Sequence, residues 1–179
     1  MCRITVFTPT YNRAYALPHL YETLQAQTFR DFEWLIVDDG SSDNTENLIQ
    51  GWIKDARLPI RHIKTPNGGK HRAINKGLAL AKGELFFIVD SDDWLPVDSL
   101  YWIDLYYSQI CSCEEFAGVA GSKCYPNGTK VGGDVTYDVL DTDNVSYREV
   151  HKIKGDMAEV WRTHVLRLSL IHISEPTRR

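Results

Sequence analysis

Short apolar runs alternate along the chain with longer segments in which apolar residues recur every three or four positions. The short runs are rich in β-branched and aromatic residues, and we expect strands at Ile4–Thr8, Phe32–Val37, Ile60–Ile63, Leu85–Val89 and Phe116–Ala120. The longer segments have helical spacing at Leu17–Leu24, Leu48–Ile53, Ala73–Ala81 and Val97–Ile110. Strands that alternate with helices predict right-handed crossovers and a parallel sheet, and therefore an α/β domain.

The start of the second predicted helix resembles a capping box. Asp43 stands three residues before Glu46, and in a capping box the two side chains at this spacing bind backbone N–H groups of the first helical turn. We therefore expect Asp43 to cap this helix.

The composition is that of an ordinary globular domain. The chain has 179 residues, of which 43% are hydrophobic and 25% charged, so it can bury a core of useful size. Its net charge is −4 and no run of Lys and Arg is longer than a pair. The sequence therefore has no basic cluster of the kind that binds DNA or RNA. An anionic ligand would need local cations, backbone amides or a metal ion.

Membrane and cysteine features point to the cell interior. No apolar run reaches the roughly 18 residues that span a bilayer, and Met1-Cys2-Arg3 leads directly into the first predicted strand without a signal peptide. The four cysteines lack the paired spacing of a zinc site, so we expect free thiols, at Cys2, Cys111, Cys113 and Cys124. These features predict a cytoplasmic protein without a transmembrane segment.

Polar residues follow four of the predicted strands, where ligands bind in open α/β sheets. The four segments read Thr8-Pro9-Thr10-Tyr11-Asn12-Arg13, Asp38-Asp39-Gly40-Ser41, Asn67-Gly68-Gly69-Lys70 and Asp90-Ser91-Asp92-Asp93. The first and fourth strands should be neighbours where the strand order reverses. We therefore expect Tyr11, Asp39 and Asp92 to line one cleft.

The acidic turn Asp90-Ser91-Asp92-Asp93 is a candidate metal site. Mg²⁺ and Mn²⁺ prefer oxygen ligands, and Mg²⁺ is commonly held by one or two carboxylates together with substrate phosphates. A D-x-D pattern is weak evidence by itself, because Asp141-Thr142-Asp143 is a second one. That second pattern follows no apolar strand, so we interpret it as a solvated loop or a helix cap. The position of the first at a strand end is what favours a metal.

The other strand ends each allow two interpretations. Asp38-Asp39 fits a plain turn, or a carboxylate that accepts hydrogen bonds from a ribose or a base. The loop before the third helix fits a flexible turn, or a phosphate site made of glycine amides and Lys70. Tyr11 can stack on a base or pack against the protein. The histidines, including His62 in a strand, are interpreted as structural or surface residues.

Together these segments resemble glycosyltransferase family 2, whose domains have the A-type glycosyltransferase fold. The resemblance covers about residues 3–110 and adds these motifs to the four strand ends: Gln27-Thr28-Phe29, Asp43, Asn75-Lys76-Gly77 and Ala81-Lys82-Gly83-Glu84. It implies a mostly parallel, Rossmann-like sheet flanked by helices. The later Gly155–Arg162 resembles a segment of one bacterial branch of the family.

The resemblance also implies an activity. A family 2 enzyme moves a sugar with inversion from a nucleotide-diphosphate donor, here a UDP-sugar, to a saccharide or lipid-linked acceptor. The implied cofactor is a divalent metal, Mn²⁺ or Mg²⁺, and the implied setting is bacterial cell-envelope polysaccharide synthesis in the cytoplasm, with the inner face of the membrane as an alternative.

The family's site residues carry over to matching positions of this chain. The substrate-binding residues would be Pro9, Thr10, Tyr11, Asn12, Arg13, Asp38, Asp39, Lys70 and Asp90. Pro9, Thr10 and Tyr11 would border the base, and Asp39 would contact base or ribose. The metal ligands would be Asp90, Asp92 and Asp93.

The general base that inversion requires is not identified. Asp156 and Glu159 are acids in the later segment, but the resemblance places the base beyond it. We interpret residues 1–167 as the nucleotide-sugar-binding domain, incomplete on its acceptor side. Residues 168–179 are similar to a translated sequencing-library adapter, and Leu168–Ile173 keeps neither strand nor helix spacing, so we expect a non-native tail. The alternative function is binding of a nucleotide-sugar without transfer.

Overall fold

The computed structural model describes residues 2–125, 127–132 and 138–170. They divide into two compact units, one within Met1–Val119 and Val160–Arg179 and the other within Ala120–Glu159. The first unit holds the four predicted strand ends. The boundary that we predicted at residue 167 is a different feature and stays a prediction.

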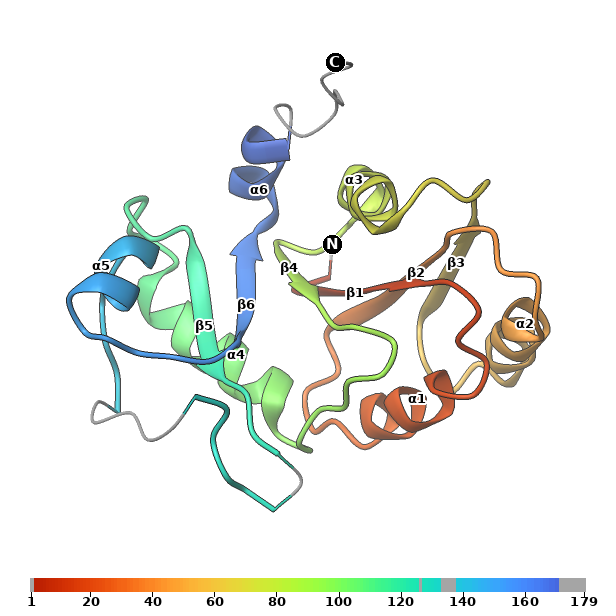
Figure 1. Ribbon diagram of the computed structural model, residues 1–179, viewed down its shortest axis with the longest axis horizontal. Coiled ribbons are helices and arrows are strands. Elements are labelled where there is room, and N and C mark those ends of the chain that lie inside the picture. The colour runs from red at the N-terminus through yellow and green to blue at the C-terminus, as the bar shows by residue number, and fades with distance from the viewer. Residues whose placement is uncertain (1, 126, 133–137, 171–179) are drawn as a thin grey trace. The chain divides into compact units, whose positions relative to one another are not determined.

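One mixed sheet contains all the described strands (Figure 1). They are β1 (Ile4–Thr10), β2 (Phe32–Asp38), β3 (Ile60–Lys64), β4 (Leu85–Ile88), β5 (Gly118–Ser122) and β6 (Met157–Arg162), in the order β3-β2-β1-β4-β6-β5. β1 pairs in parallel with β2 and β4, and β2 pairs in parallel with β3. β6 runs antiparallel to β4. The predicted α/β class and mostly parallel sheet are confirmed.

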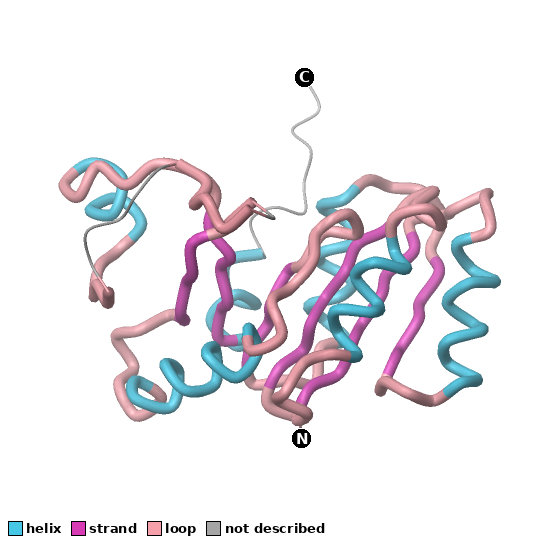
Figure 2. The backbone as a smooth tube through the Cα atoms, turned by 90° about the horizontal axis from the view of Figure 1, so that it is seen from below, coloured by secondary structure: helices cyan, strands magenta, loops and turns pink. Residues whose placement is uncertain are grey.

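Six helices are described, of which the first four were predicted by the hydrophobic pattern and the last two were not. They are α1 (Leu17–Gln25), α2 (Thr45–Asp55), α3 (Lys70–Leu80), α4 (Ser99–Ile110), α5 (Asn144–Glu149) and α6 (Thr163–Leu170). Within the first unit, α3 lies on one face of the sheet and α1 and α2 lie on the other (Figure 1). Figure 2 shows the neighbouring strands from below, in magenta between cyan helices. No helix of the described part is long and apolar enough to cross a bilayer.

Both faces of the central strands are covered. Every residue of β1 and β2 is buried, as expected where helices cover both sides of a parallel sheet. On the α3 side the rings of Phe7 and Phe86 stack with centroids 5.0 Å apart. On the other side Tyr21 stacks on Trp52 at 4.3 Å, and Trp34 lies 5.8 Å from Trp52. Two apolar layers therefore fix the strands that carry the candidate site.

The predicted capping box at α2 is wrong. The N-cap is Asn44, which makes no side-chain capping bond. Asp43 instead accepts hydrogen bonds from the amides of Thr45 at 3.0 Å and Ala14 at 3.1 Å. Glu46 forms an ion pair with Lys64 at 2.7 Å. Asp43 therefore ties the segment after β1 to the start of α2, and no oxygen reaches back as a box requires.

The second D-x-D pattern behaves as predicted. Asp143 is the N-cap of α5 and accepts hydrogen bonds from the amides of Val145 at 2.8 Å and Ser146 at 2.9 Å. The helix-cap interpretation of Asp141-Thr142-Asp143 is confirmed.

Helix α6 continues past the predicted native boundary. It ends at Leu170, so the first three residues of the predicted tail are helical although their apolar spacing is not that of a helix. The non-native origin of the tail stays a prediction. The side chain of Leu168 is 68% exposed. The rest of the predicted tail, residues 171–179, lies outside the described residues.

Candidate functional site

The strand order reverses at β1, and four polar strand ends meet there. The chain runs from β1 outward to β2 and β3 and then returns to form β4 on the other side of β1. The predicted pairing of the first and fourth strands is confirmed. Asp39 therefore follows the strand on one side of β1 and Asp92 follows the strand on the other, with the half-exposed Tyr11 after β1 between them in the strand order. This is the position at which open α/β sheets bind ligands.

Asn12 joins the segment after β1 to the segment after β2. Its amide donates to Ser41 Oγ at 2.8 Å, and its side-chain oxygen accepts from the amide of Ser42 at 2.8 Å. Asn12 has a φ of +52°, a left-handed conformation that asparagine tolerates better than most residues. This side chain is thus engaged with the protein backbone, and a direct ligand contact of Asn12 stays a prediction.

Asp39 occupies the glycine loop for which a flexible turn and a phosphate site were the two interpretations. Its two carboxylate oxygens accept hydrogen bonds from the amides of Gly68 at 2.9 Å and Gly69 at 2.7 Å. Gly40 makes this approach feasible, because it has a φ of +83° and a Cβ there would lie 2.8 Å from the Asn67 nitrogen. The anion held by these amides is therefore the protein's own carboxylate, which fixes Asp39 beside the start of α3.

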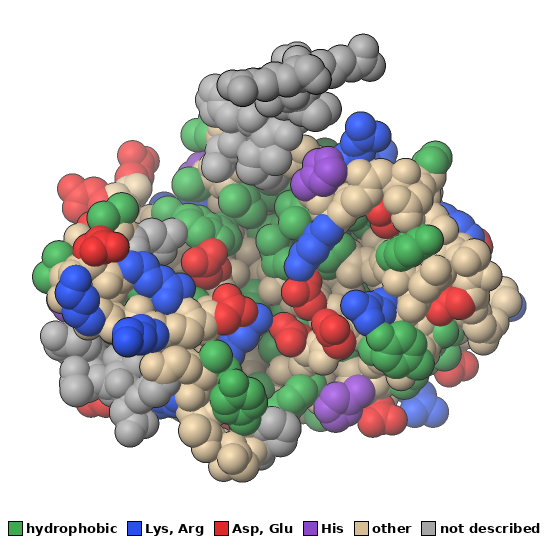
Figure 3. Space-filling model, in the orientation of Figure 1, with side chains coloured by type: hydrophobic (Ala, Val, Ile, Leu, Met, Phe, Trp, Pro, Cys, Tyr) green, Lys and Arg blue, Asp and Glu red, His purple; other side chains and the backbone are tan. Residues whose placement is uncertain are grey.

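The acidic turn is paired with cations from two other strand ends. Lys70 Nζ lies 2.7 Å from one oxygen of Asp90 and 2.8 Å from the other. Arg13 Nη2 lies 3.8 Å from Asp92 Oδ2. The side chains of Asp90 and Asp92 are 38% and 58% exposed, so they remain open to a ligand from solvent. Acidic and basic side chains lie next to one another on the face shown in Figure 3.

The carboxylates of the acidic turn suit Mn²⁺ or Mg²⁺, but they do not form a complete metal site by themselves. Among the described residues, no group of three or more His, Cys, Asp or Glu side chains converges to hold a metal. Asp90, Asp92 and Asp93 nevertheless present carboxylates on one turn after β4, and Mg²⁺ needs only one or two of these when substrate phosphates complete its shell. The residues therefore fit a metal that binds together with a diphosphate.

Asp38 and His62 form a buried pair that sequence reasoning missed. The side chain of Asp38 is 0% exposed and that of His62 is 4% exposed, and their nearest atoms, Asp38 Oδ2 and His62 Nε2, are 3.9 Å apart. Asp38 Oδ1 accepts from the amide of Ser41 at 2.8 Å. Burial lowers the pKa of His62, although the nearby Asp38 carboxylate opposes the shift. In this structure Asp38 contacts the protein rather than solvent, and its predicted contact with a substrate stays a prediction.

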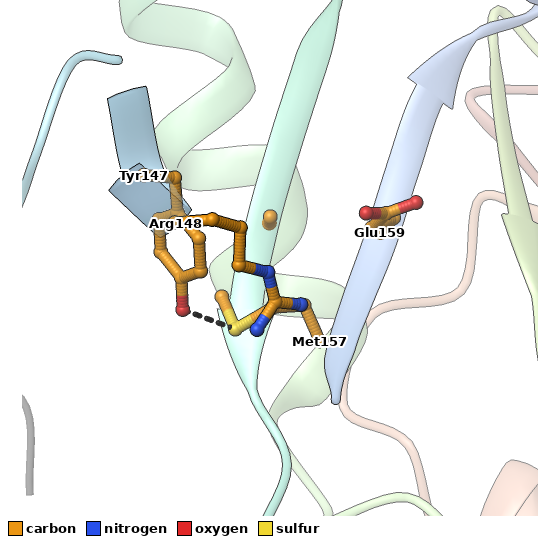
Figure 4. Close-up of a pocket in the computed structure, with 5 residues that line it drawn as sticks. Tyr147, Arg148, Met157 and Glu159 are labelled. Atoms are coloured by element: carbon orange, nitrogen blue, oxygen red, sulfur yellow. Dashed lines mark hydrogen bonds between the residues drawn. The ribbon is translucent and has the colours of Figure 1, made fainter. Parts of the chain in front are cut away.

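The second unit has its own hollow, lined by Ala120, Tyr147, Arg148, Met157 and Glu159 (Figure 4). The Tyr147 hydroxyl donates to the sulfur of Met157 at 2.8 Å, and Arg148 donates to the Gly155 carbonyl at 2.7 Å. Glu159 lines this hollow, and Asp156 forms an ion pair with Lys123 at 2.7 Å. Neither acid is assigned as a general base.

Comparison with known proteins identifies the family. The sequence profile of "Glycosyl transferase family 2" matches residues 5–102, more than half of the chain. The chain belongs to glycosyl transferase family 2. The match contains all four polar strand ends, so the site described above lies inside the family 2 region. The resemblance inferred from the sequence is confirmed.

Relatives within the family come from bacterial proteins that are longer than this chain. Glycosyltransferase GlyG of Streptococcus pneumoniae is 38% identical over 108 residues, which are 60% of this chain and 35% of GlyG. Glycosyltransferase GlyA of the same species is 30% identical over 155 residues, 82% of this chain and 21% of GlyA. The chain thus spans about a third or less of these two family 2 relatives.

Solved structures show the same A-type fold. The structure of Staphylococcus aureus TarS residues 1–349 in complex with UDP superposes with a TM-score of 0.69 at 21% identity, covering 93% of this chain and 48% of that one. Mannosyltransferase PcManGT from Pyrobaculum calidifontis, in complex with GDP-Man and Mn²⁺, superposes with a TM-score of 0.64 at 20% identity, covering 97% and 47% of the two chains. At this identity the likeness concerns the fold.

Proposed function

We propose that this family 2 protein binds a nucleotide-diphosphate sugar, a UDP-sugar, and belongs to an inverting glycosyltransferase that delivers the sugar to a saccharide or lipid-linked acceptor. The observation that carries the proposal is the meeting of polar strand ends at β1. Three links join the four ends: Asp39 is hydrogen-bonded to the glycine loop, Lys70 of that loop is paired with Asp90, and Arg13 is paired with Asp92.

The base side of the donor site would lie at the ends of β1 and β2. Tyr11 is 49% exposed after a buried strand, so its ring is available for stacking on a base. Pro9 and Thr10 precede it, and Asp39 is held rigidly by two amides with oxygen lone pairs left to accept from a base or a ribose. The UDP and UDP-GlcNAc complexes of TarS support a uridine donor.

The diphosphate side would lie at the acidic turn. Lys70 is 57% exposed and Arg13 is 39% exposed, so both can turn from the carboxylates toward phosphate oxygens. Asp90, Asp92 and Asp93 would then hold Mn²⁺ or Mg²⁺. When bound, such an ion would supply stabilisation of the negative charge that develops on the diphosphate leaving group. The Mn²⁺ in the PcManGT complex supports this part of the proposal.

Transfer also needs a carboxylate that takes the acceptor's proton, and the described residues do not identify it. Asp156 is paired with Lys123, and Glu159 lines the hollow of the second unit. These observations favour a second candidate for this chain alone, which is donor binding without transfer. Measuring the release of UDP from a UDP-sugar in the presence of acceptor glycans distinguishes the two functions, because transfer releases UDP and binding alone does not. We propose a cytoplasmic location for the donor reaction, including the inner face of the membrane.

Calorimetric titration with UDP tests the donor site and its metal. We expect UDP to bind in Mn²⁺ and to bind at least about tenfold more weakly in EDTA, a difference of roughly 1.4 kcal/mol. Asp92→Ala should cause a comparable loss in Mn²⁺. The matched control is Asp141→Ala, since Asp141 belongs to the second D-x-D in an exposed segment. Equal affinity with and without the metal, or no loss in Asp92→Ala, would contradict the metal role.

A further inference from the structure

The buried pair of Asp38 and His62 lies directly beneath the segments that would hold the base. Ile36 pairs with His62 and Asp38 pairs with Lys64 in the register of β2 and β3. Paired residues point to the same face and alternate residues share a face, so Asp38 and His62 are diagonal neighbours on one side of the sheet. Their side chains therefore face each other inside the protein.

The contact of His62 with Gln50 indicates its tautomer. Gln50 Nε2 of helix α2 lies 3.2 Å from His62 Nδ1. An amide nitrogen can only donate, so Nδ1 accepts and the proton of the neutral ring is on Nε2. Nε2 lies 3.9 Å from Asp38 Oδ2. Burial favours this neutral form, because it lowers the pKa of the imidazole.

Both facing atoms have unused hydrogen-bonding capacity. Asp38 Oδ2 and His62 Nε2 are buried and have no hydrogen-bond partner. A buried polar atom without a partner is costly, and a shift of about 1 Å would bring the two atoms to hydrogen-bonding distance. Nε2–H is a donor and the carboxylate oxygen is an acceptor, so a small movement would join the two side chains by a hydrogen bond.

The other carboxylate oxygen connects this pair to the candidate site. Asp38 Oδ1 accepts from the amide of Ser41, and Ser41 Oγ accepts from the amide of Asn12, each at 2.8 Å. Asn12 adopts a left-handed φ of +52° between Tyr11 and Arg13. A chain of hydrogen bonds therefore connects this buried carboxylate to the segments after β1 and β2.

We propose that His62 is a positioning residue for the donor site: it orients Asp38 and, through Ser41 and Asn12, the two segments that border the base. The role rests on the proposed donor function. Protonation of His62 would attract the Asp38 carboxylate more strongly than the Ser41 amide does, and would loosen these segments. Besides Asp38, the charged groups that act on His62 are Glu46 of α2 and Lys64 of β3, which neutralise each other in an ion pair of 2.7 Å.

Two variants separate this role from simple packing. His62→Leu keeps an apolar volume and removes the N–H group, whereas His62→Gln keeps an N–H donor and cannot be protonated. The control is His164→Leu, at an exposed histidine of α6. Each protein is titrated with UDP in Mn²⁺ between about pH 8 and about pH 5.5, a range that spans histidine titration. Amide hydrogen exchange of Asn12 and Ser41 is measured in parallel without ligand.

We expect His62→Leu to weaken UDP binding about fivefold, and to speed exchange of the Asn12 and Ser41 amides by a similar factor. The wild type should lose affinity as the pH falls, and His62→Gln should keep the affinity at pH 8 and lack this transition. Unchanged exchange and affinity in His62→Leu would overturn the inference. If exchange responds but the wild type binds no UDP, the donor function is overturned, and with it the role of His62 in that function.

Discussion

At the scale of single residues, the candidate site is built by side chains that already have partners. Asp39 is held by the amides of Gly68 and Gly69, and Asp90 is held by Lys70. Sequence spacing placed these residues at strand ends correctly. It could not tell which anion the glycine amides bind, because a carboxylate and a phosphate satisfy the same N–H groups. It also missed His62, because the pattern of a strand predicts burial but gives no partner.

The pairing of Lys70 with Asp90 leads to a prediction about metal affinity. Lys70→Met should raise the Mn²⁺ affinity of the UDP-free protein by up to about fivefold, since an exposed ion pair of this kind contributes at most about 1 kcal/mol. The same variant should weaken UDP binding in Mn²⁺, because a cation for the diphosphate is lost. Spin-resonance titration of Mn²⁺ and calorimetry with UDP measure the two effects.

A suitable control for Lys70 is Lys152→Met, which removes an exposed lysine that lies 3.8 Å from Glu149 in the second unit. It should leave both affinities unchanged. If Lys70→Met also leaves both unchanged, Lys70 neither competes with the metal nor contacts the diphosphate.

The buried histidine predicts a pH dependence of stability. The pKa of His62 is lowered by burial in the folded protein, whereas an unfolded chain titrates near the ordinary value of about 6.5. The unfolded state then binds more protons, so this contribution to stability is fully present above about pH 6.5 and is lost as the pH falls toward the folded pKa. Urea unfolding between about pH 7.5 and about pH 5.5 should show a smaller acid loss in His62→Gln than in the wild type. An identical loss of stability at acid pH in both proteins would show that His62 does not cause this pH dependence.

At the scale of elements, local periodicity was enough for the first four strands and the helices between them. β6 was not predicted, because its residues Met157–Arg162 give no clear alternation and are stabilised by a distant partner. Val160 pairs with Phe87, more than seventy residues earlier in the chain. A pairing of this kind depends on the assembled sheet, and no local sequence pattern determines it.

The packing of α3 on the sheet gives a stability prediction with an internal control. A Cβ at Gly77 would lie 2.1 Å from Phe7 Cε2, whereas a Cβ at Gly51 of α2 would meet no heavy atom within 4 Å. Gly77→Ala should therefore destabilise the protein by about 1–3 kcal/mol through overpacking. Gly51→Ala should stabilise it by about 0.5–1 kcal/mol, since alanine is the better helix former. Urea denaturation measures both, and equal effects of one sign would contradict the close helix–sheet contact.

At the scale of the whole molecule, the boundary that we predict after Arg167 falls inside α6. It separates a residue that packs against the end of α3 from a segment that we expect not to pack. Arg167 donates to the carbonyls of Leu78 at 3.1 Å and Ala81 at 3.0 Å, near the end of α3. Leu168, the next residue, is exposed. Arg167 thus fixes helix α6 to the end of α3 within the first unit.

Two changes at this point should differ in their effect on unfolding. Arg167→Met removes donors from two carbonyls in partly buried hydrogen bonds and should cost about 1 kcal/mol. Deletion of residues 168–179 removes the exposed last residues of α6 and the predicted tail, and should change stability by no more than about 0.5 kcal/mol. Chemical denaturation compares them. A loss of several kcal/mol on deletion would show that the segment belongs to the fold.

The return of β6 to the sheet has a consequence for how such a protein can diverge. The chain leaves the first unit after Val119 and re-enters it at Val160, and the Arg162 amide donates to the Ala117 carbonyl at 2.8 Å. The two ends of the segment Ala120–Glu159 therefore lie next to each other in the first unit, so this segment is a closed loop on that unit. The entropic cost of closing a loop rises by only about 0.6 kcal/mol for each doubling of its length. We therefore expect changes in the length of this segment to alter the closure entropy little.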